Sequence, residues 1–279
     1  MTGAARNAGE ARILAAFEEA REQGRAALMP YMMGGFPDRE ASAQIARSYA
    51  DNGADLIELG IPFSDPLADG PVIHAAAVSA LEEGTKLDDV LAVCREVSDR
   101  VAVVLMAYTN SILGGEGPVS FADRAVKAGA VGVIVPDLPL GEDENLRRIL
   151  TEAGLAVVPL IAPTTPPERR SEIGDVAAGF VYVVSSVGTT GERAEVPAHL
   201  KDLVEDVKSK TEVPVAVGFG IGSPEQAAIV GQEADGVIIG SKLVRIAGDA
   251  ERGEAPSAVG GFMADTAAAL AKSGSGSIR

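Results

Sequence analysis

The sequence predicts an α/β protein, a closed (β/α)8 barrel with an extra helix at the N-terminus and another after the second strand. Short β-branched runs alternate with longer amphipathic segments, each run is apolar along its whole length, and there are eight of them. Strands that are apolar on both faces are typical of a parallel sheet covered by helices. An open doubly wound sheet is less favoured, because the turn after the first run reads Gly34-Gly35-Phe36-Pro37 and lacks the dinucleotide-binding glycine pattern.

Each element is predicted from its own run of residues. The apolar runs predict strands at 27–33, 55–59, 101–106, 131–135, 156–161, 180–184, 213–217 and 236–239. Amphipathic segments with start and stop signals predict helices at 39–52, 87–98, 120–128, 142–153, 167–173, 197–208 and 224–231, with 241–247 and 256–271 closing the chain. The two extra helices are predicted at 11–23 and 71–83.

The chain reads as one domain covering residues 1–279, because no composition shift or linker divides it. A length of 279 residues is routine for a single barrel and allows a large core. The periodic pattern fades at both ends, so we expect residues 1–9 and 273–279 to be disordered.

Charge and composition exclude several classes of function. The chain has 24 Lys and Arg against 40 Asp and Glu, a formal net charge of −16, which argues against binding to nucleic acid. No run approaches the length of a membrane span, so we expect a cytoplasmic protein that does not bind membranes. Cys94 alone cannot form a disulfide framework, and with His74 and His199 it offers too few ligands for a structural zinc site.

Glu58 is the first candidate catalytic residue. Side chains alternate along a strand, so Leu56 and Glu58 share one face, while Ile57 and Leu59 suit the face toward the helices. Glu58 should therefore point into the end of the barrel where active sites of this fold lie. Partial burial would raise its pKa toward the range useful for proton transfer. The alternative is a structural ion pair with an arginine across the barrel.

The loop at 61–71 carries two further carboxylates. Asp65 precedes a proline and fits ordinary turn chemistry. Asp69 stands just before a helix opened by Gly70-Pro71, where the helix dipole favours negative charge. Spacing alone leaves the catalytic and the structural interpretation of Asp69 open.

Glycine-rich loops follow the last three predicted strands, at 185–191, 218–224 and 240–241. Glycine lets the backbone approach a ligand closely, and the amides of a helix start can bind an anion, so these loops together predict a phosphate site. No lysine falls within a predicted strand, which disfavours a Schiff-base aldolase. A catalytic metal shell is disfavoured too, because His74 falls in one predicted helix and His199 near the start of another. The chemistry that remains is proton transfer by carboxylates on a phosphorylated substrate.

The segment 58–71 closely resembles the signature of the tryptophan synthase α subunit family. The resemblance extends to 32–37, 135–139, 182–191, 218–221 and 240–241. It implies a carbon–carbon lyase that splits indole-3-glycerol phosphate into indole and glyceraldehyde 3-phosphate. It also implies that the indole passes to a β subunit in an α2β2 complex, and that pyridoxal phosphate is bound by the β partner, with no cofactor and no metal in this chain.

The resemblance also implies the roles of particular residues. Glu58 would be the proton-shuttling acid/base and Asp69 the carboxylate that holds the indole N–H. The substrate-binding positions would be Tyr182, Thr190, Gly191, Gly220, Gly240 and Ser241. Tyr31 departs from the family pattern, since an apolar aromatic is common there, and the stretch 114–117 is unusually rich in glycine in a loop that faces the β subunit.

Three alternatives stay open beside this prediction. A sugar-phosphate isomerase or epimerase would share the phosphate loops but not the motif at 58–71. A free-standing indole-releasing lyase of the same family would share both the phosphate loops and the motif at 58–71. A module that has lost catalysis and only regulates a β partner is disfavoured, because both Glu58 and Asp69 are retained.

Overall fold

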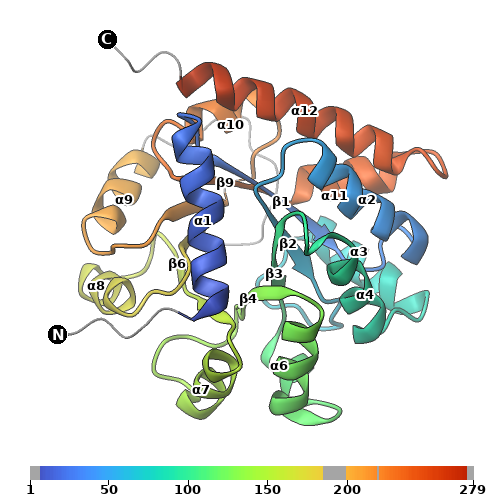
Figure 1. Ribbon diagram of the computed structural model, residues 1–279, viewed down its shortest axis with the longest axis horizontal. Coiled ribbons are helices and arrows are strands. Elements are labelled where there is room, and N and C mark those ends of the chain that lie inside the picture. The colour runs from blue at the N-terminus through green and yellow to red at the C-terminus, as the bar shows by residue number, and fades with distance from the viewer. Residues whose placement is uncertain (1–6, 185–198, 219, 275–279) are drawn as a thin grey trace.

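The computed structural model describes residues 7–184, 199–218 and 220–274, which form a nearly closed barrel of parallel strands surrounded by helices (Figure 1). The strand order is β5-β4-β3-β2-β1-β9-β8-β7-β6. The strands are β1 (Ala27–Met33), β2 (Leu56–Gly60), β3 (Ala102–Met106), β4 (Ala130–Ile134), β5 (Ala156–Val158), β6 (Leu160–Ile161), β7 (Val181–Val184), β8 (Val215–Gly218) and β9 (Gly236–Ile239). This arrangement confirms the predicted (β/α)8 barrel.

The barrel closes where one predicted strand is divided in two. The run at 156–161 was predicted as a single strand, but the structure has β5 and β6 with Pro159 between them. Proline has no N–H to give to a neighbouring strand, so it interrupts the ladder. Its carbonyl still accepts a hydrogen bond from the Tyr182 amide at 2.9 Å. The two ends of the strand order are thus consecutive in the chain.

The helices cover the outside of the barrel and agree with the predicted segments, with one addition. The five-residue α5 was not predicted. They are α1 (Ala8–Glu22), α2 (Arg39–Asp51), α3 (Pro71–Glu82), α4 (Leu87–Val97), α5 (Thr109–Leu113), α6 (Gly117–Lys127), α7 (Glu144–Glu152), α8 (Pro167–Asp175), α9 (His199–Lys208), α10 (Pro224–Val230), α11 (Ser241–Asp249) and α12 (Ala255–Gly274). None of the helices in the described ranges is long and apolar enough to cross a membrane.

Both ends of the barrel chain are more ordered than the sequence predicted. Asn7 caps α1 by accepting a hydrogen bond from the Glu10 amide, and its own side chain donates to the Leu155 carbonyl at 3.1 Å. Helix α12 continues to Gly274. The expected disorder is therefore wrong for residues 7–9 and 273–274; residues 1–6 and 275–279 lie outside the described residues.

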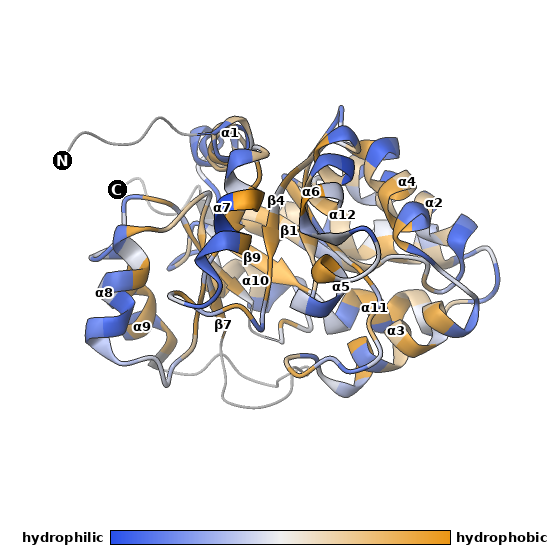
Figure 2. Ribbon diagram, turned by 90° about the horizontal axis from the view of Figure 1, so that it is seen from below, coloured by the Kyte–Doolittle hydropathy of each residue, from blue (hydrophilic) through white to orange (hydrophobic). Residues whose placement is uncertain are grey.

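Two apolar layers separate the inside of the barrel from the helices. The outer layer packs strands against helices, and the inner layer fills the barrel. Ile13 and Phe17 of α1 belong to the inner layer, so this helix closes the end where the strands begin (Figure 1). Figure 2 shows the apolar strands inside and the hydrophilic helix faces outside. The opposite end, where the carboxyl ends of the strands lie, is called the mouth below.

Candidate active site

Glu58 lies in the middle of β2 with its side chain inside the barrel. Leu56 belongs to the inner layer, whereas Ile57 and Leu59 belong to the outer one, as the alternation of the strand predicts. Glu58 is paired in register with Tyr31 of β1 and is only 2% exposed. Among the described residues, its Oε2 atom has no hydrogen-bond partner. A buried carboxyl oxygen without a partner is unusual and points to a functional role.

Burial holds Glu58 in its neutral form. Removal from water and, to a lesser extent, the nearby charge of Asp69 together raise its pKa from 4.5 to about 8. The ion pairs of the described ranges do not include Glu58, which leaves the structural ion-pair alternative without support. At neutral pH the carboxyl group can therefore donate a proton.

Asp69 lies on the loop between β2 and α3, beside the Gly70 cap of α3. Burial raises its pKa from 3.8 to about 6, while a hydrogen bond from the Tyr108 hydroxyl and the charge of His74 act in the opposite direction. The same hydroxyl accepts a hydrogen bond from the Ala68 amide at 3.1 Å. Asp69 thus accepts a hydrogen bond from a hydroxyl that the Ala68 amide holds in place, and it is mostly ionised at neutral pH.

Tyr108 was not among the candidate site residues, although the structure brings it to Asp69. It follows the end of β3, and its ring stacks on Phe63 with centroids 5.2 Å apart. Thr109, the next residue, donates from its amide and its hydroxyl to the Asp137 side chain at 2.9 and 3.0 Å. The available signal was a polar side chain directly after a strand, which in this fold lies at the mouth.

The proposed phosphate loops gather at the ends of β8 and β9. Gly220 has a positive φ of 65°, a conformation that favours glycine. Gly240 is the cap of α11, so Ser241, which is buried, is the first helical residue rather than the cap. The first-turn amides of α11 therefore begin at the mouth, where they can face an anion. Gly222 donates instead to Gln226 Oε1 at 2.8 Å.

Two tyrosine rings lie across glycines of the neighbouring strands. A Cβ atom at Gly60 would come within 2.3 Å of the Tyr31 hydroxyl, and one at Gly218 within 2.5 Å of the Tyr182 hydroxyl. Burial, together with the charges of Glu58 and Asp69, raises the pKa values of both tyrosines. The side chains of Tyr31 and Tyr182 therefore reach the space occupied by the two acids.

Two further sequence candidates, Thr190 and Gly191, fall outside the described residues. Asp65 is exposed and accepts a hydrogen bond from the Ser64 hydroxyl at 2.6 Å, in agreement with its interpretation as a turn residue. In the part of the chain that the structure describes, no three His, Cys, Asp or Glu side chains come together as a possible metal site.

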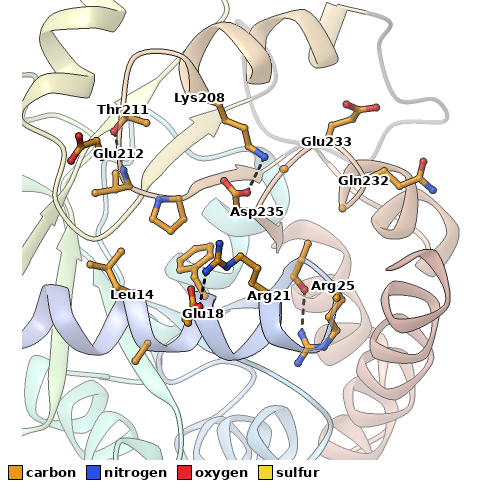
Figure 3. A pocket seen from close by; sticks show the side chains of 18 of the residues that line it. Leu14, Glu18, Arg21, Arg25, Lys208, Thr211, Glu212, Gln232, Glu233 and Asp235 are labelled. Carbon is orange, nitrogen blue, oxygen red and sulfur yellow. Dashed lines mark hydrogen bonds and ion pairs between the residues drawn. The ribbon is translucent and has the colours of Figure 1, made fainter. Parts of the chain in front are cut away.

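A cavity of about 1290 Å³ lies at the other end of the barrel, between α1 and the loops that precede β8 and β9 (Figure 3). Several of its charged side chains are paired with one another. Lys208 of α9 contacts Asp235 at 2.8 Å, and Arg21 contacts Glu18 within α1 at 2.6 Å. The lining of the cavity includes neither of the candidate acids.

Fold and site together define the class of the protein. It is a (β/α)8 barrel whose two partly protonated acids share the mouth with a helix start suited to an anion. Barrel enzymes carry their active sites at this end. The class is a (β/α)8-barrel enzyme with its active site at the mouth.

Comparison with known proteins identifies the family. A family model described as "Tryptophan synthase alpha chain" matches residues 17–265. The chain is 44% identical to the tryptophan synthase alpha chain of Rippkaea orientalis over 257 residues, covering 91% of this chain and 96% of the relative. It is 47% identical to that of Carboxydothermus hydrogenoformans over 237 residues, covering 84% and 88%.

Solved structures give the same result. A chain of Mycobacterium tuberculosis tryptophan synthase is similar with a TM-score of 0.86 and 36% identity, covering 93% of this chain and 98% of that one. The tryptophan synthase subunit alpha of Legionella pneumophila has a TM-score of 0.84 and 36% identity, with the same coverage of 93% and 98%. The chain belongs to the tryptophan synthase alpha chain family, whose α subunit cleaves indole-3-glycerol phosphate and works with a β subunit in tryptophan synthesis.

Proposed function

We propose that Glu58 and Asp69 carry out the cleavage of indole-3-glycerol phosphate as a complementary pair of acids. The observation that carries the proposal is the separation of their pKa values, about 8 for Glu58 and about 6 for Asp69. At neutral pH one carboxyl group is then mostly protonated and the other mostly ionised. Such a separation is typical of residues with distinct acid and base roles.

In the reaction, Glu58 first donates a proton and then accepts one, while Asp69 stabilises the charge on the indole ring. Glu58 donates its proton to C3 of the indole ring, and the ring nitrogen takes up the resulting positive charge. Asp69, already ionised, accepts a hydrogen bond from the ring N–H and stabilises that charge. The Glu58 carboxylate then takes the proton from the hydroxyl group on the carbon attached to C3. The carbon–carbon bond breaks, the aldehyde forms, its bond electrons restore neutral indole, and Glu58 is again protonated.

The far end of the substrate is assigned to the loops after β8 and β9. We propose that Gly220, Gly240 and Ser241 bind the phosphate and that Tyr182 lies beside the substrate. Thr190 and Gly191 keep the substrate-binding roles that the family resemblance implies. Amides and the dipole of α11 suit an anion on a chain with a net charge of −16. Phosphate binding would hold the indole end against the two acids.

We also propose the wider setting of the reaction. The chain acts as one domain over residues 1–279, in the cytoplasm, as the α subunit of an α2β2 complex. Pyridoxal phosphate belongs to the β partner, where it supplies the chemistry that consumes the indole. The motif at 58–71 and the family membership support this assignment, and a free-standing indole-releasing lyase is the second candidate.

An indole-release assay with purified indole-3-glycerol phosphate tests the proposal, with and without an added β subunit. Glu58→Gln should lose indole release almost completely, and Asp69→Asn should lose most of it. Asp65→Asn, an exposed acid of the same loop, is the matched control and should keep the basal rate measured without partner. Wild-type rates in Glu58→Gln would remove Glu58 from the mechanism. A rate that does not respond to the β subunit would favour the free-standing lyase.

A further inference from the structure

Tyr31 stands between the two halves of the site. In the sheet, β1 lies between β2, which carries Glu58, and β9, which leads into Gly240. Tyr31 is paired in register with Glu58. On its other side, a Cβ atom at Gly240 would lie 3.7 Å from the Cβ atom of Tyr31. A ligand that reaches from the acids to the start of α11 therefore has to pass over this ring.

The hydroxyl group of Tyr31 lies at the acid side of that path and has no strong partner among the described residues. The ring crosses Gly60, so the hydroxyl is on the β2 side of β1. Tyr31 is 3% exposed, and the contact that the structure gives its hydroxyl is to Met33 Sδ at 4.0 Å. A thioether is a weak acceptor, and buried hydroxyls normally have an oxygen or nitrogen partner.

The surroundings of this hydroxyl favour its role as a donor. Burial and the charges of Asp69 and Glu58 raise its pKa, so it stays protonated. Glu58 also has an oxygen atom without a partner among the described residues. Two groups with incomplete hydrogen bonding among the described residues thus occupy paired positions on neighbouring strands, and an oxygen atom supplied by a ligand would complete the hydrogen bonding there.

We propose that the Tyr31 hydroxyl binds a hydroxyl group of the glycerol chain, between the indole ring and the phosphate, and so selects a hydroxylated chain over a plain one. The inference rests on the proposed function, because that substrate joins a ring near the acids to a phosphate at α11. The chain between them carries the hydroxyl groups that match the position of Tyr31. Tyr31 is then a substrate-binding residue that determines specificity.

A pair of ligands tests this inference at equilibrium. One is indole-3-glycerol phosphate, and the other is its deoxy analogue, in which a plain three-carbon chain joins the indole ring to the phosphate. Binding is measured by calorimetry in Glu58→Gln, which prevents turnover, and in Glu58→Gln combined with Tyr31→Phe. Loss of one hydrogen bond should weaken the glycerol ligand by about 3- to 15-fold, while the deoxy analogue stays within about twofold.

Tyr49→Phe in the same background is the matched control. Tyr49 is also a buried tyrosine, but its hydroxyl donates to the Tyr31 carbonyl at 3.4 Å from the helix layer, so neither ligand should be affected. Equal weakening of both ligands by Tyr31→Phe would overturn the inference, as would no change in either. If neither ligand binds the Glu58→Gln chain, the proposed substrate is wrong, and the role of Tyr31 fails with it.

Discussion

The buried carboxyl group of Glu58 should make the folded protein less stable as the pH rises, and Glu58→Gln should remove this loss. The pKa of Glu58 is raised from 4.5 to about 8 in the folded chain. Between these two values the folded state binds more protons than the unfolded state, so the free energy of unfolding falls with increasing pH. The stabilisation is fully present below about pH 4.5 and is lost as the pH passes through about 8.

The size of the effect follows from the same two values. At about 1.4 kcal/mol per pH unit, the whole difference is worth about 5 kcal/mol, of which about 3 kcal/mol falls between pH 5.5 and pH 8.5. Glutamine has the same shape and no proton to lose. The free energy of unfolding of Glu58→Gln, measured relative to wild type, should therefore increase by about 3 kcal/mol over this range.

Urea unfolding followed by circular dichroism at pH 5.5, 7.0 and 8.5 measures this difference. Glu83→Gln is the matched control. This substitution makes the same chemical change at an exposed residue at the end of α3, outside the site. A stability difference for Glu58→Gln that stays constant over the three pH values would refute the reasoning. A difference of opposite sign would indicate that Glu58 is stabilised as the carboxylate.

Three further predictions concern the neighbours of the two acids. Tyr108→Phe removes a hydrogen bond that lowers the pKa of Asp69. The acid limb of the pH profile of kcat/KM for indole release should therefore move to higher pH, and an unchanged limb would contradict this prediction. Gly60→Ala brings a Cβ atom within 2.3 Å of the Tyr31 hydroxyl. It should lower the free energy of unfolding, measured with urea, by about 1–3 kcal/mol. An unchanged free energy of unfolding would mean that the Tyr31 ring moves freely. Ser241→Asp puts a negative charge at the first turn of α11 and should weaken binding of inorganic phosphate at least about tenfold in calorimetry; unchanged binding would locate the phosphate elsewhere.

The fold was predictable because its strands are apolar on both faces and its helices are amphipathic. Alternation within β2 was enough to direct Glu58 into the barrel. The division of one strand at Pro159 was less accessible, because an apolar run hides the loss of a single N–H donor. The short α5 was missed since five residues carry too little periodicity to distinguish a helix from a loop.

The site was predictable only in part, because its contacts join distant parts of the chain. Asp69 could be a helix-start residue or a functional acid until its surroundings were known. The hydrogen bonds of Tyr108 connect the end of β3 to a loop 40 residues earlier, a contact that no local pattern encodes. The incomplete hydrogen bonding of Tyr31 likewise depends on the packing of its ring over Gly60 and could not be read from neighbouring residues.

The central claim is that Glu58 is held protonated at neutral pH, ready to donate to the substrate. Direct titration of its side-chain carboxyl carbon by NMR, assigned by comparison with Glu58→Gln, tests this most closely. We predict a midpoint near pH 8 in the free chain. A midpoint near the ordinary value of 4.5 would contradict the account, because Glu58 would then be a carboxylate with no proton to give.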